Sequence, residues 1–405
     1  MTESHPDHLH DPDPDPDPDP DAPLARPAPG PAPGDTPDPA PGPAPGLRCR
    51  VRVGSADGVL AIVPHLLGFN PADSLVVLGI GGPHARIRVT FRYDLPEPPD
   101  SELAADIAAH AASVLARQAL TIAVVIGYGR GAVVTPVVDV VIPALLEAGV
   151  IVHDVLRVED RRYWSYVCGD PACCPPEGVP FDPAAHPAAS ALSEAGLTVR
   201  SDRAELAGTL APAAESAQSM ARAVDRARRR AAQLIEDTIA VSGACDVFQP
   251  VADAGRRSVR KAVARYRREG ALTDHDEIAW LGLTLTDLRV RDDAWARMDP
   301  SCTVAHLRLW TDLVRLLPAE LVPAPAALLA FTAWQAGDGA LASIAIERAL
   351  DADPEYSMAL LVAEALHAGL PPSAARLPMT PKQVAASYAR RRTGRPGPGE
   401  SRRAC

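Results

Sequence analysis

Lysine is nearly absent from this 405-residue chain, and no apolar run is long enough to cross a membrane. Of the 40 basic residues only Lys261 and Lys382 are lysine, a bias that, together with abundant Ala, Pro and Gly, is typical of a GC-rich coding genome. A transmembrane helix needs about 18 consecutive apolar residues, and a signal peptide has a basic segment before its apolar one. Because the chain shows neither pattern, we expect neither a membrane protein nor a Sec-exported one, and we predict a cytoplasmic location.

Aromatic residues are also scarce, at 4%, although hydrophobic residues make up 47% of the chain and suffice for folded cores. The seven cysteines are an odd number in a long chain without an export signal. Disulfide frameworks are typical of small secreted domains, so we do not expect one here. At about 150 residues per domain, the length allows roughly two or three domains.

Residues 1–46 carry ten acidic residues and one basic residue, and they include an Asp-Pro repeat from Asp11 to Pro20. Their net charge of −9, subtracted from the total of −11, leaves −2 for the rest of the chain. Alternating proline and the repulsion between like charges favour an extended, unfolded segment. We therefore predict a disordered N-terminal tail over residues 1–46. A second disordered tail, basic and rich in Gly and Pro, is predicted over residues 391–405.

Between the tails the hydrophobic pattern changes once. Over residues 47–200, apolar runs alternate with amphipathic segments, beginning with a predicted strand at 47–53. The alternation of Arg with apolar residues at 86–93 is typical of a half-buried antiparallel strand, and the apolar run at 120–126 fits a strand covered on both faces. With the helix and strand that follow, to residue 158, this run predicts a right-handed βαβ unit. The first domain is therefore predicted to be α/β, a mixed sheet with flanking helices, ending in a Cys- and Pro-rich loop.

After that loop the strand patterns disappear, and residues 201–390 show helical periodicity that predicts an all-α domain. Within it, residues 323–368 resemble the second half of a tetratricopeptide repeat. Small residues at Ala342 and Ala349 allow two helices to pack closely, and Pro354 ends the second helix. One such unit predicts a repeat-like helical hairpin packed on its own domain or, alternatively, a groove that binds a protein partner.

Polar residues gather near the predicted strand ends and offer candidate catalytic groups: His65, Asp73, Ser74, Asp94, Arg162 and Trp164. A hydrolase can be assembled from a serine, a histidine and an aspartate, but the G-x-S-x-G elbow that exposes such a serine is missing from the sequence. The alternative interpretation is that these residues cap helices and make hydrogen bonds in the core.

Three cysteines form a C-x4-C-C pattern at Cys168, Cys173 and Cys174, and His153 precedes them. Zinc is held by Cys and His ligands, usually four, and usually from two C-x2-4-C or H-x3-5-H pairs. Here the second pair is missing, so three interpretations stay open. The cysteines are structural thiols, a metal site with His153 as a candidate ligand, or a redox or nucleophilic site that needs a base beside it.

Two patterns that often accompany phosphate ligands are incomplete. Gly127 to Ala132 fits the G-x-G-x-x-A turn of dinucleotide sites, but no acidic residue ends the next strand at the expected distance. Residues 220–270 carry a net charge of +6 without a known nucleic-acid-binding motif. We expect a glycine-rich turn, and a basic face that is solvated or meets the chain's own acidic tail. Nucleic acid is not an expected partner.

Five segments together carry a family resemblance: VPHLLGFNPADSLVV (63–77), RYDLP (92–96), RYWSY (162–166), CCPPEG (173–178) and AWQAGDGA (333–340). They resemble an actinobacterial family known as domain of unknown function 4192, over residues 47 to about 376. Asn70 stands where this family is expected to have arginine, which weakens any argument for an anion site there. The resemblance implies a cytoplasmic actinobacterial protein, and it supplies no reaction, cofactor or catalytic residue.

Taken together, these features predict a non-enzymatic interaction or regulatory protein that binds a protein partner through its helical domain. One alternative is an enzyme that acts on a small or phosphorylated ligand at the strand ends of the α/β domain. Another is a metal or redox site at the three cysteines. The residues leave the cofactor and the oligomeric state open.

Overall fold

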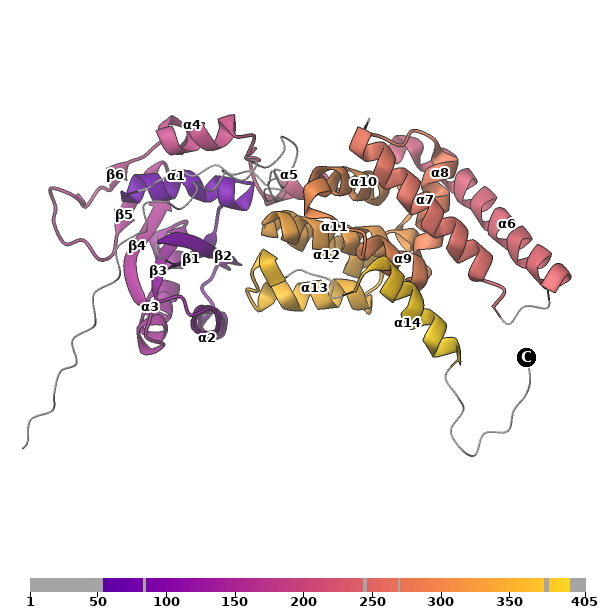
Figure 1. The fold of residues 1–405 in the computed structure, drawn as a ribbon. Coiled ribbons are helices and arrows are strands. Elements are labelled where there is room, and N and C mark those ends of the chain that lie inside the picture. Colours follow the sequence, from indigo (N-terminus) through magenta and orange to yellow (C-terminus); the bar gives the residue numbers. More distant parts are fainter. Residues whose placement is uncertain (1–53, 83–84, 243–245, 269, 375–378, 394–405) are drawn as a thin grey trace, which may run out of the picture. The chain divides into compact units, whose positions relative to one another are not determined.

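The structure is a computed structural model that describes residues 54–82, 85–242, 246–268, 270–374 and 379–393 (Figure 1). The strand predicted at 47–53, the tail predicted at 1–46 and residues 394–405 lie outside these ranges. Residues 391–393, predicted as tail, belong instead to helix α14 (Pro381–Thr393). The Thr380 hydroxyl accepts the Gln383 N–H, and the Gln383 side chain accepts the Thr380 N–H. This reciprocal capping pair starts a helix that the sequence interpretation overlooked.

One six-stranded sheet forms the α/β part, in the order β2-β1-β3-β4-β5-β6. Strands β3 and β4 are parallel, and every other neighbouring pair is antiparallel. The predicted mixed sheet with flanking helices is therefore confirmed. Its strands are β1 (Ser74–Gly81), β2 (Arg86–Asp94), β3 (Ile122–Tyr128), β4 (Ile151–Glu159), β5 (Arg162–Ser165) and β6 (Val179–Pro180).

Helices cover both faces of this sheet. Helix α1 (Ala56–Leu67) lies on one face, and α2 (Ser101–Arg117) and α3 (Gly131–Glu147) lie on the other (Figure 1). Successive strand residues point to opposite faces, so Leu75 packs with α2 and α3, whereas its neighbour Val76 packs with α1. Both side chains are fully buried, which explains why β1 and β3 are continuous apolar runs.

The glycine-rich turn after β3 leads directly into α3, which begins at Gly131. A Cβ atom on Gly127 would lie 2.1 Å from Cγ1 of Val134, so only glycine allows the helix this close to the strand. Gly129 has a φ of 130°, a conformation that other residues rarely adopt. The predicted glycine-rich turn thus has a packing role in the structure.

Strands β5 and β6 follow the predicted α/β pattern but were not themselves predicted. With four and two residues, they are too short for an alternating pattern to stand out. They frame residues 166–178, which we call the cysteine loop.

From Pro187 onward the described residues are mainly helical, as predicted for residues 201–390. Helix α9 follows α8 closely, because the Asp287 carboxylate accepts the Arg289 N–H at 2.8 Å and caps a new helix. The elements are α4 (Pro187–Glu194), α5 (Arg203–Gly208), α6 (Ala217–Ser242), α7 (Gln249–Arg268), α8 (His275–Leu285), α9 (Leu288–Trp295), α10 (Thr303–Leu316), α11 (Pro323–Ala336), α12 (Gly339–Ala352), α13 (Ser357–His367) and α14.

Helix α11 lies at the centre of the helical part, where every residue from Pro323 to Trp334 is buried. Helices α10 and α12 pack against it, and Trp310 of α10 is among the largest fully buried side chains. The likeness of this region to a tetratricopeptide repeat stays a prediction. Within the described ranges, no helix has the length and apolar character needed to cross a membrane.

Candidate metal centre

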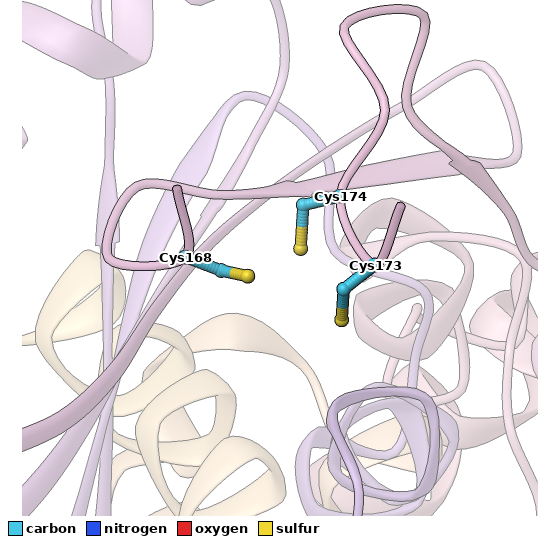
Figure 2. A group of neighbouring side chains, drawn as sticks. All are labelled: Cys168, Cys173 and Cys174. Carbon is cyan, nitrogen blue, oxygen red and sulfur yellow. The ribbon is translucent and has the colours of Figure 1, made fainter. Parts of the chain in front are cut away.

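The side chains of Cys168, Cys173 and Cys174 lie close together, with Cys168 on one stretch of the cysteine loop and the adjacent Cys173 and Cys174 on another (Figure 2). Their three Sγ atoms all lie within 4.8 Å of one another. Cys173 is exposed and the other two are half-buried, and all three are free thiols. Among the residues that the structure describes, these three are the one group of His, Cys, Asp or Glu with this convergence.

This spacing is close to what a metal ion needs. Zinc bonds to thiolate sulfur at about 2.3 Å, so two ligands of a tetrahedral ion stand about 3.8 Å apart. The widest sulfur pair therefore has to close by at most about 1 Å, which side-chain rotation within the loop can supply. The three thiols can bind one thiophilic ion with little change of the backbone.

The backbone around Asp170 folds the loop so that the thiols meet. The Asp170 carbonyl accepts the N–H groups of Cys173 and Cys174, at 3.1 and 2.7 Å. Its carboxylate accepts the Ala172 N–H at 2.9 Å. The Asp170 N–H in turn donates to the Cys168 sulfur. One residue thus organises both stretches of the loop.

Ser165, the last residue of β5, fixes the start of the loop. Its hydroxyl donates to the Asp154 carboxylate at 3.1 Å and accepts the N–H groups of Val167 and Cys168, at 3.3 and 3.2 Å. The orientation of Cys168 is therefore set by a short hydrogen-bonded chain that begins on β4.

Two residues predicted as catalytic candidates, Arg162 and Trp164, fix the end of the loop. Arg162 donates to the carbonyl oxygen of Gly178 at 2.8 Å, and the Trp164 indole N–H donates to that of Pro176 at 3.0 Å. The Arg157 guanidinium stacks on the Trp164 ring at 3.8 Å from its centroid. These contacts give both candidate residues a part in holding the loop.

The hydrogen bonds among the thiols separate their proton affinities. The Asp170 N–H lowers the pKa of Cys168, and the thiol of Cys174 lowers it further by donating to the same sulfur. The same bond raises the pKa of Cys174 to about 12, because its proton is held between the two sulfur atoms. The negative charge of one thiolate therefore disfavours ionisation of a second thiol in the cluster. A bound cation offsets this repulsion and allows more of the sulfur atoms to ionise.

His153, the predicted fourth ligand, is an exposed residue near the start of β4 and is not in the group of converging side chains. The described part of the chain therefore offers three cysteine ligands from one loop and leaves His153 outside.

The six catalytic candidates are not brought together. Ser74 on β1 lies opposite Asp94 on β2 in the strand register, and both side chains lie on the face that α1 covers. Arg162 and Trp164 flank Tyr163, which packs on that same α1 face, so their own side chains point to the other face. An active site made of all six is not compatible with this arrangement.

The other candidates make local contacts. The His65 Nε2 lies 3.1 Å from the Ser193 hydroxyl, and burial lowers the pKa of His65. Asp73 is exposed at a turn with a φ of 41°. The Asp94 carboxylate pairs with Arg92 at 2.6 Å, and the Ser74 hydroxyl is buried with no partner among the described atoms.

Sequence reasoning missed the roles of Asp154, Asp170 and Gly178 in holding the cysteine loop. The signals available were weak: an aspartate two residues after Cys168, and a glycine that closes the Pro-rich turn. Gly178 has a φ of 82°, and a Cβ there would lie 2.5 Å from the Trp164 ring. Such requirements follow from the folded loop and not from ligand spacing.

Comparison with known proteins places the chain in a family. A family model described as "Domain of unknown function (DUF4192)" matches residues 57–373, which include the whole sheet and the cysteine loop. No curated protein and no solved structure matches the chain. The resemblance noted in the sequence is confirmed, and this chain belongs to the DUF4192 family.

Proposed function

We propose that the chain is a non-enzymatic, metal-binding regulatory protein in which Cys168, Cys173 and Cys174 hold one Zn²⁺ ion. The convergence of three sulfur atoms within 4.8 Å supports this function most directly. Thiolate ligands select soft or borderline ions such as Zn²⁺ and Cu⁺ over Mg²⁺ and Ca²⁺. The dispersed positions of the catalytic candidates favour a regulatory role over an enzymatic one.

Three protein ligands leave a tetrahedral ion with one further position. In zinc proteins that position takes a water molecule or a ligand atom from outside the chain. The exposure of Cys173 keeps this side of the cluster accessible to solvent. We therefore expect the bound ion to be reachable by small ligands and by chelators.

Metal binding would also fix the cysteine loop. The hydrogen bonds of Asp170 already hold Cys168 near the Cys173–Cys174 pair, so little ordering is needed when the ion binds. Ligands must be deprotonated, so binding releases thiol protons and weakens as the pH falls.

Zinc content of the full-length chain tests this function. The parent protein, loaded with Zn²⁺ and dialysed, is expected to retain about one ion per chain by mass spectrometry of the metal. Cys168→Ser, Cys173→Ser and Cys174→Ser should each lose most of it. Co²⁺ substitution should give sulfur-to-metal charge-transfer bands in the parent that fade in each variant.

Two variants serve as matched controls. Cys302→Ala removes a thiol that is buried at 8% exposure in the helical part, and His153→Ala removes the exposed histidine near the loop. Both should retain the zinc of the parent. If the three serine variants bind as much zinc as these controls, the three cysteines do not form a metal site.

A further inference from the structure

We propose that the cysteine loop is also a site of reversible oxidation, at which a hydroperoxide joins Cys168 to Cys174 in a disulfide and thereby releases the metal ion. The release of metal rests on the proposed function, whereas the disulfide itself does not. The positions of the three thiols indicate which two of them form the disulfide.

Disulfide geometry decides which two thiols pair. The Cα atoms of bonded cysteines usually lie 4.4–6.8 Å apart, whereas consecutive Cα atoms across a trans peptide are about 3.8 Å apart. Adjacent Cys173 and Cys174 are thus poor partners for each other. Cys168 comes from the other stretch of the loop, and its Sγ lies within 4.8 Å of both.

Of the two possible partners, Cys174 is favoured by its burial. Both Cys173 and Cys174 make hydrogen bonds to the Cys168 sulfur, that of Cys174 being the stronger, but only Cys174 is half-buried like Cys168. Cys173 is exposed, and its side chain runs beside that of Cys174 rather than toward Cys168 (Figure 2). After oxidation it would be the thiol that is left free.

The reaction balances with the hydroperoxide as the one oxidant. The Cys168 sulfur attacks an oxygen of the peroxide, the O–O bond breaks, and the leaving alkoxide takes the thiol proton to become an alcohol. The Cys174 sulfur then attacks the sulfenic acid, the S–S bond forms, and the hydroxyl leaves with the Cys174 proton as water. The two sulfurs lose two electrons and the peroxide gains them.

Oxidation and metal binding exclude each other in this loop. A disulfide removes two of the three thiolate ligands, and the single thiol of Cys173 cannot hold zinc alone. Arg162 and Trp164 donate to the backbone carbonyls of Gly178 and Pro176, which follow the cysteines in the chain. These hydrogen bonds involve no sulfur atom, so they persist in both the metal-bound and the oxidised loop. A dithiol reductant should therefore restore both the thiols and the zinc site.

The test exposes the full-length chain, with and without Zn²⁺, to stoichiometric hydrogen peroxide. Peptide mapping should find the Cys168–Cys174 disulfide in the metal-free chain, and a chelating dye should detect zinc released from the loaded chain. The Cys173→Ser and Cys302→Ala variants should still form the disulfide. Cys168→Ser and Cys174→Ser should not.

Each other outcome has a definite meaning. Retention of the disulfide in Cys174→Ser with its loss in Cys173→Ser would overturn the pairing. Sulfinic or sulfonic products in the parent, with no disulfide, would overturn the oxidation proposal itself. If the metal-free chain forms the disulfide but no zinc is bound, the proposed function fails while the oxidation site stands. If zinc binds and no disulfide forms, the reverse holds.

Discussion

Replacement of Trp164 by phenylalanine measures how far the anchor of the cysteine loop supports metal binding. The change removes the indole N–H that donates to the Pro176 carbonyl at 3.0 Å and keeps an aromatic ring beneath Arg157. A hydrogen bond of this kind is worth about 0.5–1.5 kcal/mol, so the free loop should populate open conformations more often by a corresponding factor. Zinc affinity should then fall, by up to roughly tenfold.

The assay is competition for Zn²⁺ with a chromophoric chelator at fixed pH. Trp164→Ala is expected to weaken binding more than Trp164→Phe, because it also removes the ring that contacts Arg157 and Gly178. Trp295→Phe is the control, since the indole nitrogen of Trp295 has no partner among the described atoms and lies in the helical part. Zinc affinity equal to that of the parent in both Trp164 variants would refute the idea that the anchor supports the site.

Three further predictions concern stability. Gly178→Ala should lower the free energy of unfolding by about 1–2 kcal/mol in denaturant titrations, because a left-handed φ of 82° and a Cβ 2.5 Å from the Trp164 ring both disfavour a side chain; no loss would contradict this. Ser74→Ala should leave thermal stability unchanged or raised, since it deletes a fully buried hydroxyl with no partner among the described atoms, and a clear fall in melting temperature would show a hidden partner. Burial lowers the pKa of His306 to about 4. As the pH falls, this histidine therefore binds a proton in the unfolded chain before it does so in the folded one. The free energy of unfolding should drop between about pH 6.5 and 4, by up to roughly 3 kcal/mol. That drop should shrink in His306→Leu, and an unchanged pH dependence would place its origin elsewhere.

The sheet was predictable wherever a strand has a clear period. The apolar run of β3 and the Arg alternation of β2 both appear in the structure. Strands β5 and β6 escaped because two to four residues carry no period. Helix α9 escaped because its eight residues are few for a helical period to show.

The candidate site was predictable only in its sulfur atoms. The three cysteines are close in sequence, so a short loop brings them together almost regardless of the fold. The positions predicted for His153 and the catalytic candidates depended on which face of the sheet each strand residue takes. A shift of one residue in the alternation moves a side chain to the opposite face. The support by Ser165 and Asp170 arises from backbone hydrogen bonds, which leave little trace in residue spacing.

Strand β6, which follows the cysteine loop, also affects whether the protein can associate with itself through the edge of its sheet. The edge of a sheet exposes unpaired backbone groups that can recruit a strand from another molecule. Here β6 pairs with β5 through Val179 and Pro180, and proline has no N–H to offer a further strand. The loop that carries the cysteines therefore also delivers the residue that ends the sheet. Loss of the anchors at Arg162 or Trp164 should uncover the β5 edge and make the protein prone to aggregate.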